Sequence, residues 1–204
     1  VPGTIVGERY RIVSPLARGG FGAVYVADHI TTERRVALKL LVHHLEGMSV
    51  DRLLAEARVT TRLSSDHIVQ VLDAGIDATS STVFVVMELL SGSTLEDLVQ
   101  QRGPCSAEQT AELLRQLAVG LDKAHGYVDA SGNRAPIVHR DLKPGNLFLT
   151  QRDDGRPLLK ILDFGTAKVL SQNTQASGMI RGTPQYMAYG QASGDPITPR
   201  TDIW

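Results

Sequence analysis

The hydrophobic pattern of this chain changes near residue 90 of 204. Up to that point, apolar residues recur with the short periods of β-strands in segments at 9–13, 23–27, 36–41, 68–72 and 83–87. Between the third and fourth segments, Leu53, Leu54 and Ala57 have the spacing of a helix. The first part of the chain is therefore expected to form a mostly antiparallel, five-stranded sheet that carries one helix.

Helical periodicity dominates after residue 90. Ser106, with Gln109 three residues later, has the pattern of a capping box at a helix start. The helix that follows is expected to end at Gly126, and its apolar face is expected to run through Leu113, Leu117, Leu121 and Ala124.

The region beyond this helix contains two further patterns. Short apolar segments at 146–150 and 158–162 flank the turn sequence Asp153-Asp154-Gly155, which predicts a β-hairpin. Residues 166–199 show no sustained periodicity and are rich in Ser, Thr, Gly, Gln and Pro. A stretch of this length indicates either a functional loop or disorder.

Composition excludes several classes of protein. The chain is 42% hydrophobic and 21% charged, as is ordinary for a globular protein. Its net charge of −1 gives no strong electrostatic attraction to nucleic acid or to an anionic membrane. The single cysteine, Cys105, excludes an internal disulfide framework and a cysteine-based zinc site, and fits a reducing compartment. The longest apolar run, 83–90, is interrupted by Glu88 and is too short to span a bilayer. We expect an intracellular piece of a larger protein, because the chain begins at Val1 rather than Met.

Two features of the first ninety residues each allow two interpretations. The glycine cluster at 18–24 lies between two expected strands, and its backbone N–H groups can approach phosphate oxygens; an ordinary glycine-rich hairpin is the alternative. Lys39 is the one charge in an apolar strand, where burial is costly without an anion. It either pairs with Glu56 to fix a phosphate or extends from a half-exposed strand into solvent.

The segment 139–146, His-Arg-Asp-Leu-Lys-Pro-Gly-Asn, carries a more specific signal. Asp141, Lys143 and Asn146 offer a carboxylate base, a fixed cation and a neutral metal ligand on one loop. Asp163-Phe164-Gly165 follows an apolar segment and adds a second carboxylate that suits Mg²⁺. Phosphoryl transfer to a hydroxyl requires these roles: a group that orients the nucleophile, a charge that neutralises the phosphate, and ligands for a divalent ion.

The ordered set of motifs resembles the protein kinases, and most of all the bacterial Ser/Thr kinases of eukaryotic type. The resemblance extends to the segment 182–188 and covers nearly the whole chain. It implies an α+β, two-lobed fold. The N-terminal lobe, residues 1–90, would be an antiparallel sheet plus one helix that binds ATP. The C-terminal lobe, residues 91–204, would be helical and partial, with the catalytic loop and the activation segment but without later helices.

The resemblance also assigns the residues that would bind ATP between the lobes. Lys39, paired with Glu56, would hold the α- and β-phosphates, and Met87 would guard the back of the adenine pocket. The carbonyl of Glu88 and the backbone of Leu90 would hydrogen-bond the adenine edge. The glycine-rich loop would cover the phosphates, and apolar side chains would hold the purine from both faces; these residues are Leu16, Ala17, Arg18, Gly19, Gly20, Phe21, Gly22, Ala23, Val24, Ala37 and Phe148.

Catalytic and metal-binding roles follow from the same resemblance. Asp141 would be the catalytic base, Lys143 would steady the γ-phosphate, and Asn146 with Asp163 would ligate Mg²⁺. The implied reaction is transfer of the ATP γ-phosphate to Ser or Thr hydroxyls of protein substrates, including autophosphorylation, for which the chain would dimerise. Arg140 implies switching by a phosphate on the activation loop, where the candidate acceptors are Ser171, Thr174, Ser177 and Thr183.

The sequence departs from the family pattern at three places. Ala17 stands where the first loop glycine is usual, and Ala188-Tyr189-Gly190 replaces the usual Ala-Pro-Glu. The chain stops at 201–204, so the helices that would follow Asp202 are expected to be absent, and with them the packing for the long helix. Asp202 itself resembles the aspartate that braces the catalytic loop.

Two other functions remain open beside the kinase interpretation. A nucleotide-binding pseudokinase or scaffold without turnover is the alternative from a non-enzyme class. A small-molecule phosphotransferase is less favoured, because the segment 182–188 resembles a platform for a protein substrate. The expected location is cytoplasmic, with a cytoplasmic domain of a membrane-anchored protein as the variant, and no nucleic acid partner is expected.

Overall fold

The computed structural model describes residues 1–19, 22–41, 54, 60–164 and 184–204. It separates into two compact units, Val1–Arg62 with Gln70–Leu90, and Leu63–Val69 with Ser91–Trp204. Most of the helix expected around Leu53 and Ala57 lies outside the described residues; Leu54 is described, and it is helical and buried.

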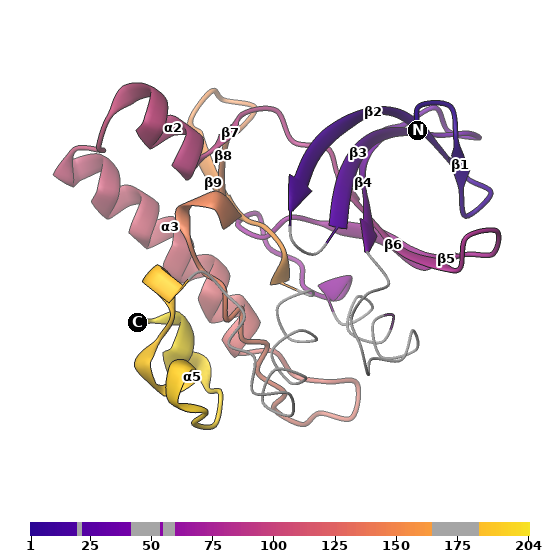
Figure 1. The fold of residues 1–204 in the computed structure, drawn as a ribbon. Helices are drawn as coiled ribbons and strands as arrows, with labels where there is room; N and C mark the ends of the chain where they lie inside the picture. The colour runs from indigo at the N-terminus through magenta and orange to yellow at the C-terminus, as the bar shows by residue number, and fades with distance from the viewer. Residues whose placement is uncertain (20–21, 42–53, 55–59, 165–183) are drawn as a thin grey trace. The chain divides into compact units, whose positions relative to one another are not determined.

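The first unit contains an antiparallel sheet of six strands in the order β1-β2-β3-β4-β6-β5 (Figure 1). The strands are β1 (Ile5–Val6), β2 (Tyr10–Gly19), β3 (Gly22–His29), β4 (Arg35–Leu41), β5 (Val71–Asp77) and β6 (Thr82–Glu88). The expectation of five strands was wrong by one, because the two-residue strand β1 is too short to show a period and pairs with β2 through Ile5 and Val6.

The fourth expected strand, at 68–72, is displaced along the chain. Ile68 instead forms a parallel bridge with Ile161, and Val69 donates its backbone N–H to the Ile161 carbonyl at 3.0 Å. These backbone groups are therefore not available to the sheet of the first unit, and β5 begins only at Val71.

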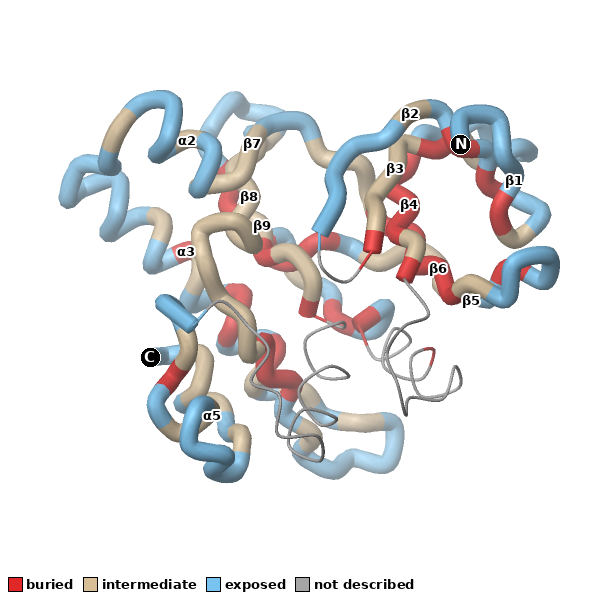
Figure 2. Tube along the Cα trace, viewed as in Figure 1, coloured by how far each residue is buried: buried red, intermediate tan, exposed pale blue. Residues whose placement is uncertain are grey.

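The core of the first unit forms where the inward faces of its strands meet. Phe84 on β6 is 1% exposed and packs with Tyr10, Ile12 and Leu38 from β2 and β4. A fully buried apolar side chain of this size contributes about 1.5–3 kcal/mol. Strands β4 and β6 are buried along most of their lengths, whereas the end of β2 is exposed (Figure 2).

The second unit combines helices with a three-stranded sheet in the order β7-β8-β9. Its strands are β7 (Ser93–Thr94), β8 (Leu147–Gln151) and β9 (Pro157–Ile161), and the hairpin between the last two forms as predicted. The α-helices among its described residues are α2 (Leu95–Arg102), α3 (Ala107–His125) and α5 (Tyr189–Ser193). Three short 3₁₀ helices complete the described elements: η1 (Pro144–Asn146), η2 (Pro184–Tyr186) and η3 (Pro199–Asp202).

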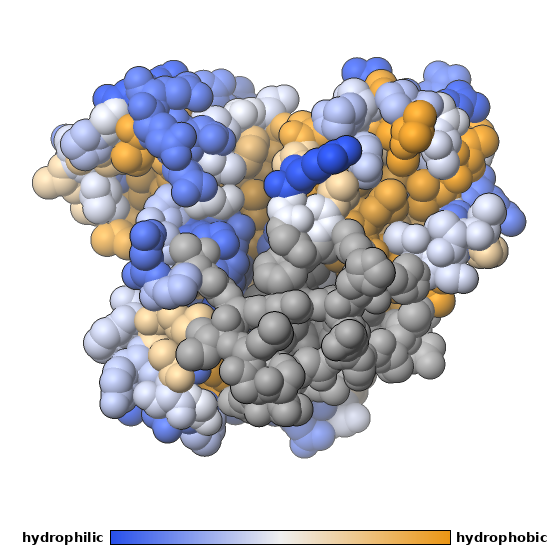
Figure 3. Space-filling view, viewed as in Figure 1, coloured by the Kyte–Doolittle hydropathy of each residue, from blue (hydrophilic) through white to orange (hydrophobic). Residues whose placement is uncertain are grey.

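Both longer helices of the second unit begin with a capping box. Ser106 accepts from the Gln109 backbone N–H while the Gln109 side chain accepts from the Ser106 N–H, as predicted. Thr94 and Asp97 cap α2 in the same way, although that helix was not predicted from the sequence. No residue of α2 is buried, and Figure 3 shows hydrophilic atoms over it.

The buried face of α3 differs from the predicted apolar face. Gln116, Gly120, Leu121 and Ala124 are buried, whereas Leu113 and Leu117 are only partly buried. Gln116 donates to the Pro157 carbonyl and accepts from the Leu159 N–H at 2.8 Å, so this polar side chain faces β9. Hydrophobic periodicity alone could not predict this burial, because the Gln116 amide hydrogen-bonds to backbone groups of β9.

Candidate active site

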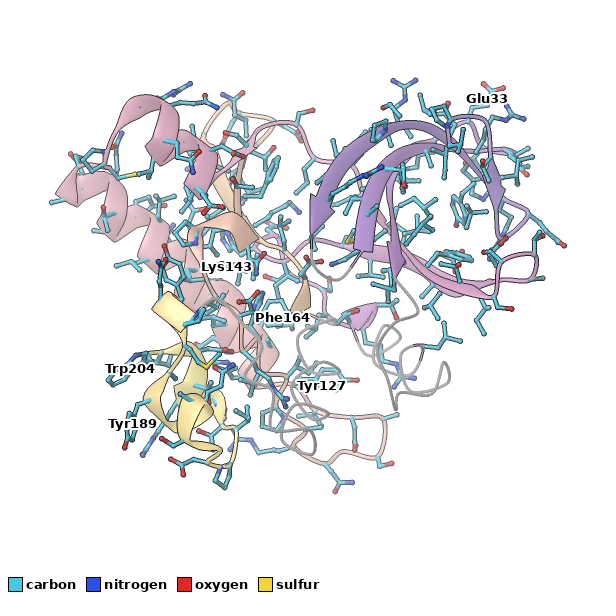
Figure 4. The ribbon with its side chains drawn as sticks, viewed as in Figure 1. Glu33, Tyr127, Lys143, Phe164, Tyr189 and Trp204 are labelled. Atoms are coloured by element: carbon cyan, nitrogen blue, oxygen red, sulfur yellow. The ribbon has the colours of Figure 1, made fainter. Side chains whose placement is uncertain are left out.

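The loop at 139–146 brings together the three polar side chains that the sequence singled out. Lys143 Nζ lies 3.0 Å from Asp141 Oδ2, and both side chains are mostly buried. Asn146 Nδ2 donates to the Asp141 carbonyl at 2.7 Å and to Asp141 Oδ2 at 3.1 Å. The 3₁₀ helix η1 produces this proximity, because it turns the chain between Lys143 and Leu147. Lys143 is labelled in Figure 4.

A backbone hydrogen bond connects Asn146 to the residue before Asp163. Leu162 donates its N–H to the Asn146 carbonyl at 2.9 Å, and Asp163 follows it with a positive φ of 60°. The next residue, Phe164, is 2% exposed and packs edge-on against the buried His139 ring, with centroids 4.9 Å apart. Both halves of the predicted magnesium pair therefore belong to one compact arrangement in the second unit.

The donor chemistry of this arrangement suits a hard cation. Both hydrogen bonds to Asp141 use the Asn146 amide nitrogen, which leaves the amide oxygen for another partner. Magnesium typically takes one or two protein oxygens and completes its shell with substrate phosphates and water. Within the described ranges, no group of three or more His, Cys, Asp and Glu side chains forms a metal cage. The Asn146 and Asp163 pair thus fits a site shared with a phosphate ligand.

The glycine cluster in the first unit is a β-hairpin whose strands pair up to Gly19 and Gly22. Gly22 has a φ of +147°, and a Cβ there would lie 2.0 Å from the Leu40 carbonyl oxygen. Only glycine fits at this position. Leu16, Ala17, Arg18 and Gly19 are exposed on β2, and Ala23 and Val24 are partly buried on β3. Gly20 and Phe21 lie outside the described residues.

Lys39 is buried in the middle of the sheet, at 5% exposure. Its strand β4 pairs Lys39 with Val24 of β3 on one side and with Val85 of β6 on the other. Ala37, two residues earlier on the same face of the strand, pairs with Met87, which is also buried. The structure therefore places Lys39 and Ala37 on one face of the sheet, and their contact with a nucleotide stays a prediction.

Two hydrogen bonds with Gln70 fix Glu88, the last residue of β6. Glu88 donates its backbone N–H to the Gln70 carbonyl, and its carboxylate accepts from the Gln70 N–H at 2.7 Å. Leu90 follows at the end of the first unit. Phe148 belongs to the second unit, on β8 opposite Lys160.

Several predicted residues lie outside the described residues. They are Glu56, Gly165 and the candidate phosphate acceptors Ser171, Thr174, Ser177 and Thr183.

Two residues that were not predicted from the sequence contact the loop at 139–146 or the Asp202 carboxylate that binds it. His125 at the end of α3 approaches the Asp202 carboxylate at 2.8 Å, and Gln191 of α5 donates to the Arg140 carbonyl at 3.0 Å. His125 lies four residues after Leu121 and so continues the predicted apolar face of α3, a position at which a polar residue is a signal for a buried contact. Gln191 carries no comparable signal, because the segment around it lacks periodicity.

Comparison with known proteins identifies the family. The protein kinase domain matches residues 10–204, and the chain belongs to the protein kinase family. The curated relatives include serine/threonine-protein kinase Pkn1 of Myxococcus xanthus, 39% identical over 98% of this chain and 28% of Pkn1. PknK of Mycobacterium tuberculosis is 34% identical over 100% of this chain and 17% of PknK. The chain thus spans less than a third of either relative.

Solved structures show the same fold. The crystal structure of the Mycobacterium tuberculosis PknI kinase domain matches with a TM-score of 0.74 at 23% identity, over 99% of this chain and 72% of that one. The α+β kinase fold with an antiparallel sheet in its N-terminal lobe is therefore confirmed, as is the resemblance to bacterial Ser/Thr kinases. None of the described helices is long and apolar enough to cross a bilayer.

Proposed function

We propose that this chain transfers the γ-phosphate of ATP to Ser or Thr hydroxyls of protein substrates with the aid of Mg²⁺. The observation that carries the proposal is the contact of Asp141 with both Lys143 and Asn146. These contacts join a base, a cation and a metal ligand at a single carboxylate. The family generally uses ATP and Mg²⁺, and its bacterial relatives are named as Ser/Thr kinases.

Each residue of this group has a separate role in the proposed reaction. The Asp141 carboxylate would orient the substrate hydroxyl and accept its proton as the hydroxyl oxygen bonds to the γ-phosphorus; the bond from that phosphorus to the β-phosphate oxygen breaks, and ADP leaves. Lys143 neutralises charge on the transferred phosphoryl group, and its ion pair with Asp141 keeps both side chains in place. Asn146 and Asp163 would hold the metal, and Lys39 would hold the nucleotide phosphates. When bound, ATP supplies the transferable phosphoryl group and Mg²⁺ neutralises the charge on the phosphates.

Transfer of labelled phosphate from ATP to casein tests the proposal, with Asp141→Asn as the critical variant. We expect the rate to fall about a hundredfold or more, the usual loss when a general base is removed. The affinity for a fluorescent ATP analogue should change little, because Asp141 acts on the acceptor hydroxyl. Asp153→Asn, on the exposed turn of the β8–β9 hairpin, is the matched control.

The same experiment separates the alternatives. Analysis of the labelled amino acid distinguishes Ser and Thr from other acceptors. Nucleotide binding without any transfer by the unmodified chain would contradict the proposal and favour the pseudokinase. Equal loss of binding and transfer in Asp141→Asn would indicate a structural role for that carboxylate instead.

A further inference from the structure

Helix α2 brings one carboxylate onto the loop at 139–146. Glu96, in the first turn of α2, extends its side chain over Gly145: a Cβ added to Gly145 would lie 2.8 Å from Glu96 Oε2. Gly145 belongs to η1, against which α2 packs, and both elements belong to the second unit. The carboxylate lies this close to the backbone of the loop because residue 145 has no side chain.

The charge of Glu96 is not compensated within the part of the chain that the structure describes. There, Glu96 is exposed and forms neither an ion pair nor a hydrogen bond through its carboxylate. The neighbouring Asp97 carboxylate, in contrast, accepts from the N–H and the hydroxyl of Thr94 at the helix start. Lys143, the cation of the loop, lies 3.0 Å from Asp141. Glu96 therefore presents an accessible negative charge to a ligand that approaches the loop.

The place of Glu96 relative to Asp141 limits which ligand can use this charge. Gly145 is four residues from Asp141 in the sequence, and four residues span at most about 14 Å. The chain between them is folded, because Asn146 Nδ2 donates to Asp141 Oδ2 at 3.1 Å. An extended peptide advances about 3.3 Å per residue. A peptide whose hydroxyl lies at Asp141 therefore reaches Glu96 with a side chain that is no more than about four positions from that hydroxyl.

We propose that Glu96 is a specificity-determining residue that selects a basic side chain within four positions of the phosphorylated Ser or Thr. The inference rests on the proposed function and names its substrate class: peptide segments that carry Arg, or less favourably Lys, near the acceptor. Arg is preferred because its planar guanidinium forms two parallel hydrogen bonds with one carboxylate, whereas the Lys ammonium acts as a point charge. The ion pair contributes to substrate binding and adds no step to phosphoryl transfer.

Peptide binding tests this selection independently of phosphate transfer. Fluorescein-labelled peptides carry Ala at the acceptor position in a neutral background, and each has a single Arg at one of the four positions on either side. We expect Arg at one position, or at two neighbouring ones, to lower the dissociation constant about threefold, as one exposed ion pair can. The gain should shrink in 0.5 M NaCl, because salt screens exposed charges. Fluorescence anisotropy measures both effects.

Variants at two glutamates identify the carboxylate that causes the gain. Glu96→Gln keeps the shape of the side chain and removes its charge, so the gain from Arg should disappear. Glu96→Lys should transfer the gain to Glu at the same peptide position. Glu108→Gln is the matched control, because Glu108 is also an exposed glutamate in the first turn of a helix, α3. An equal gain from Arg in Glu96→Gln and Glu108→Gln, or no gain at any position, would overturn the proposal.

A variant of the loop tests the place from which the carboxylate acts. Gly145 does not have a positive φ, so its backbone accepts alanine, but the added methyl group would lie 2.8 Å from Glu96 Oε2 and displace it. We expect the gain from Arg to fall in Gly145→Ala or to move to a neighbouring peptide position. An unchanged gain at the unchanged position would contradict the placement of Glu96 over Gly145.

The phosphate-transfer assay uses the same peptides with Ser restored at the acceptor position. Arg at the preferred position should lower KM about threefold and leave kcat nearly unchanged, because the ion pair is the same in the bound substrate and in the transition state. Glu96→Gln should remove this difference between peptides. Transfer with equal KM for Arg and neutral peptides would overturn the selection alone. If the unmodified chain transfers phosphate to none of the peptides, the proposed function fails, and the binding experiment still decides whether Glu96 selects basic residues.

Discussion

Tyr10 connects two distant strands of the first unit through one hydroxyl group. It donates to Asp73 Oδ2 at 2.7 Å, and Arg9 lies 3.0 Å from the same oxygen. Burial of the ring and the hydrogen bond to Asp73 both favour the neutral phenol, which raises the pKa of Tyr10 to about 12. Residue-scale contacts of this kind join β2 to β5 across 63 positions of sequence.

The raised pKa of Tyr10 predicts a pH dependence of stability. The unfolded phenol loses its proton near pH 10, whereas the folded one keeps it to about 12. The stabilising contribution is therefore complete below pH 10 and is lost as the pH rises through 12. Tyr10→Phe should cost about 1 kcal/mol near neutral pH and abolish this alkaline decline. Urea unfolding at neutral and alkaline pH measures the loss of stability and its pH dependence. Tyr189→Phe is the control, because Tyr189 is exposed; Figure 4 shows it at the surface.

The two glycines that close the β2–β3 hairpin give a sharp comparison. A Cβ at Gly22 would lie 2.0 Å from a backbone oxygen, which cannot move aside as a flexible side chain would, whereas a Cβ at Gly19 would meet nothing within 4 Å. We expect Gly22→Ala to lower the free energy of unfolding by at least about 2 kcal/mol. Gly19→Ala should stay within about 0.5 kcal/mol. Similar losses in both variants, measured in urea, would contradict the close approach seen at Gly22.

At the scale of elements, the start of α3 depends on its capping box. Ser106→Ala removes the acceptor for the Gln109 N–H and should cost about 1 kcal/mol of stability. Ser106→Asp keeps an acceptor and should stay close to the unmodified chain. Cys105→Ala, at the exposed neighbouring position, is the control. Chemical unfolding followed by circular dichroism gives the free energy of unfolding of each variant. An unchanged free energy of unfolding in Ser106→Ala would show that tertiary packing alone fixes the helix start.

Two elements set by local sequence could be predicted, although α2 with its own capping box was missed; the extent of an element set by distant partners could not be predicted. The β8–β9 hairpin and α3 follow from a turn sequence and a capping box that act over a few residues. Strand β5 contains Asp73 and Asp77, which interrupt its apolar pattern, so its length could not be predicted. Each carboxylate accepts a hydrogen bond from a residue more than sixty positions away. The same division applies to the site. Asp141 to Asn146 form a local motif, whereas Gln191 reaches Arg140 across 51 positions.

At the scale of the whole molecule, the residues proposed to bind the nucleotide belong to two compact units. Lys39 belongs to the first unit, and Asn146 and Asp163 belong to the second. Each group is ordered by contacts within its own unit: the sheet around Lys39, and the loop at 139–146 around Asn146. A ligand that binds the folded chain and not the unfolded one raises the free energy of unfolding.

Mg²⁺-ATP should therefore raise the thermal midpoint of the 204-residue chain. At a ligand concentration of about a hundred times the dissociation constant, linkage adds about 2.7 kcal/mol, which corresponds to a shift of roughly 5–10 °C for a chain of this size. Lys39→Ala and Asp163→Ala should each lose most of the shift at the same ATP concentration, because one removes the cation that binds the phosphates and the other a metal ligand.

Lys123→Ala and Asp153→Ala are the matched controls, because they alter the same residue types at exposed positions; both should keep the shift. Omission of Mg²⁺ should reduce the shift in the unmodified chain but have little further effect in Asp163→Ala. A full shift in both site variants would mean that the nucleotide binds elsewhere.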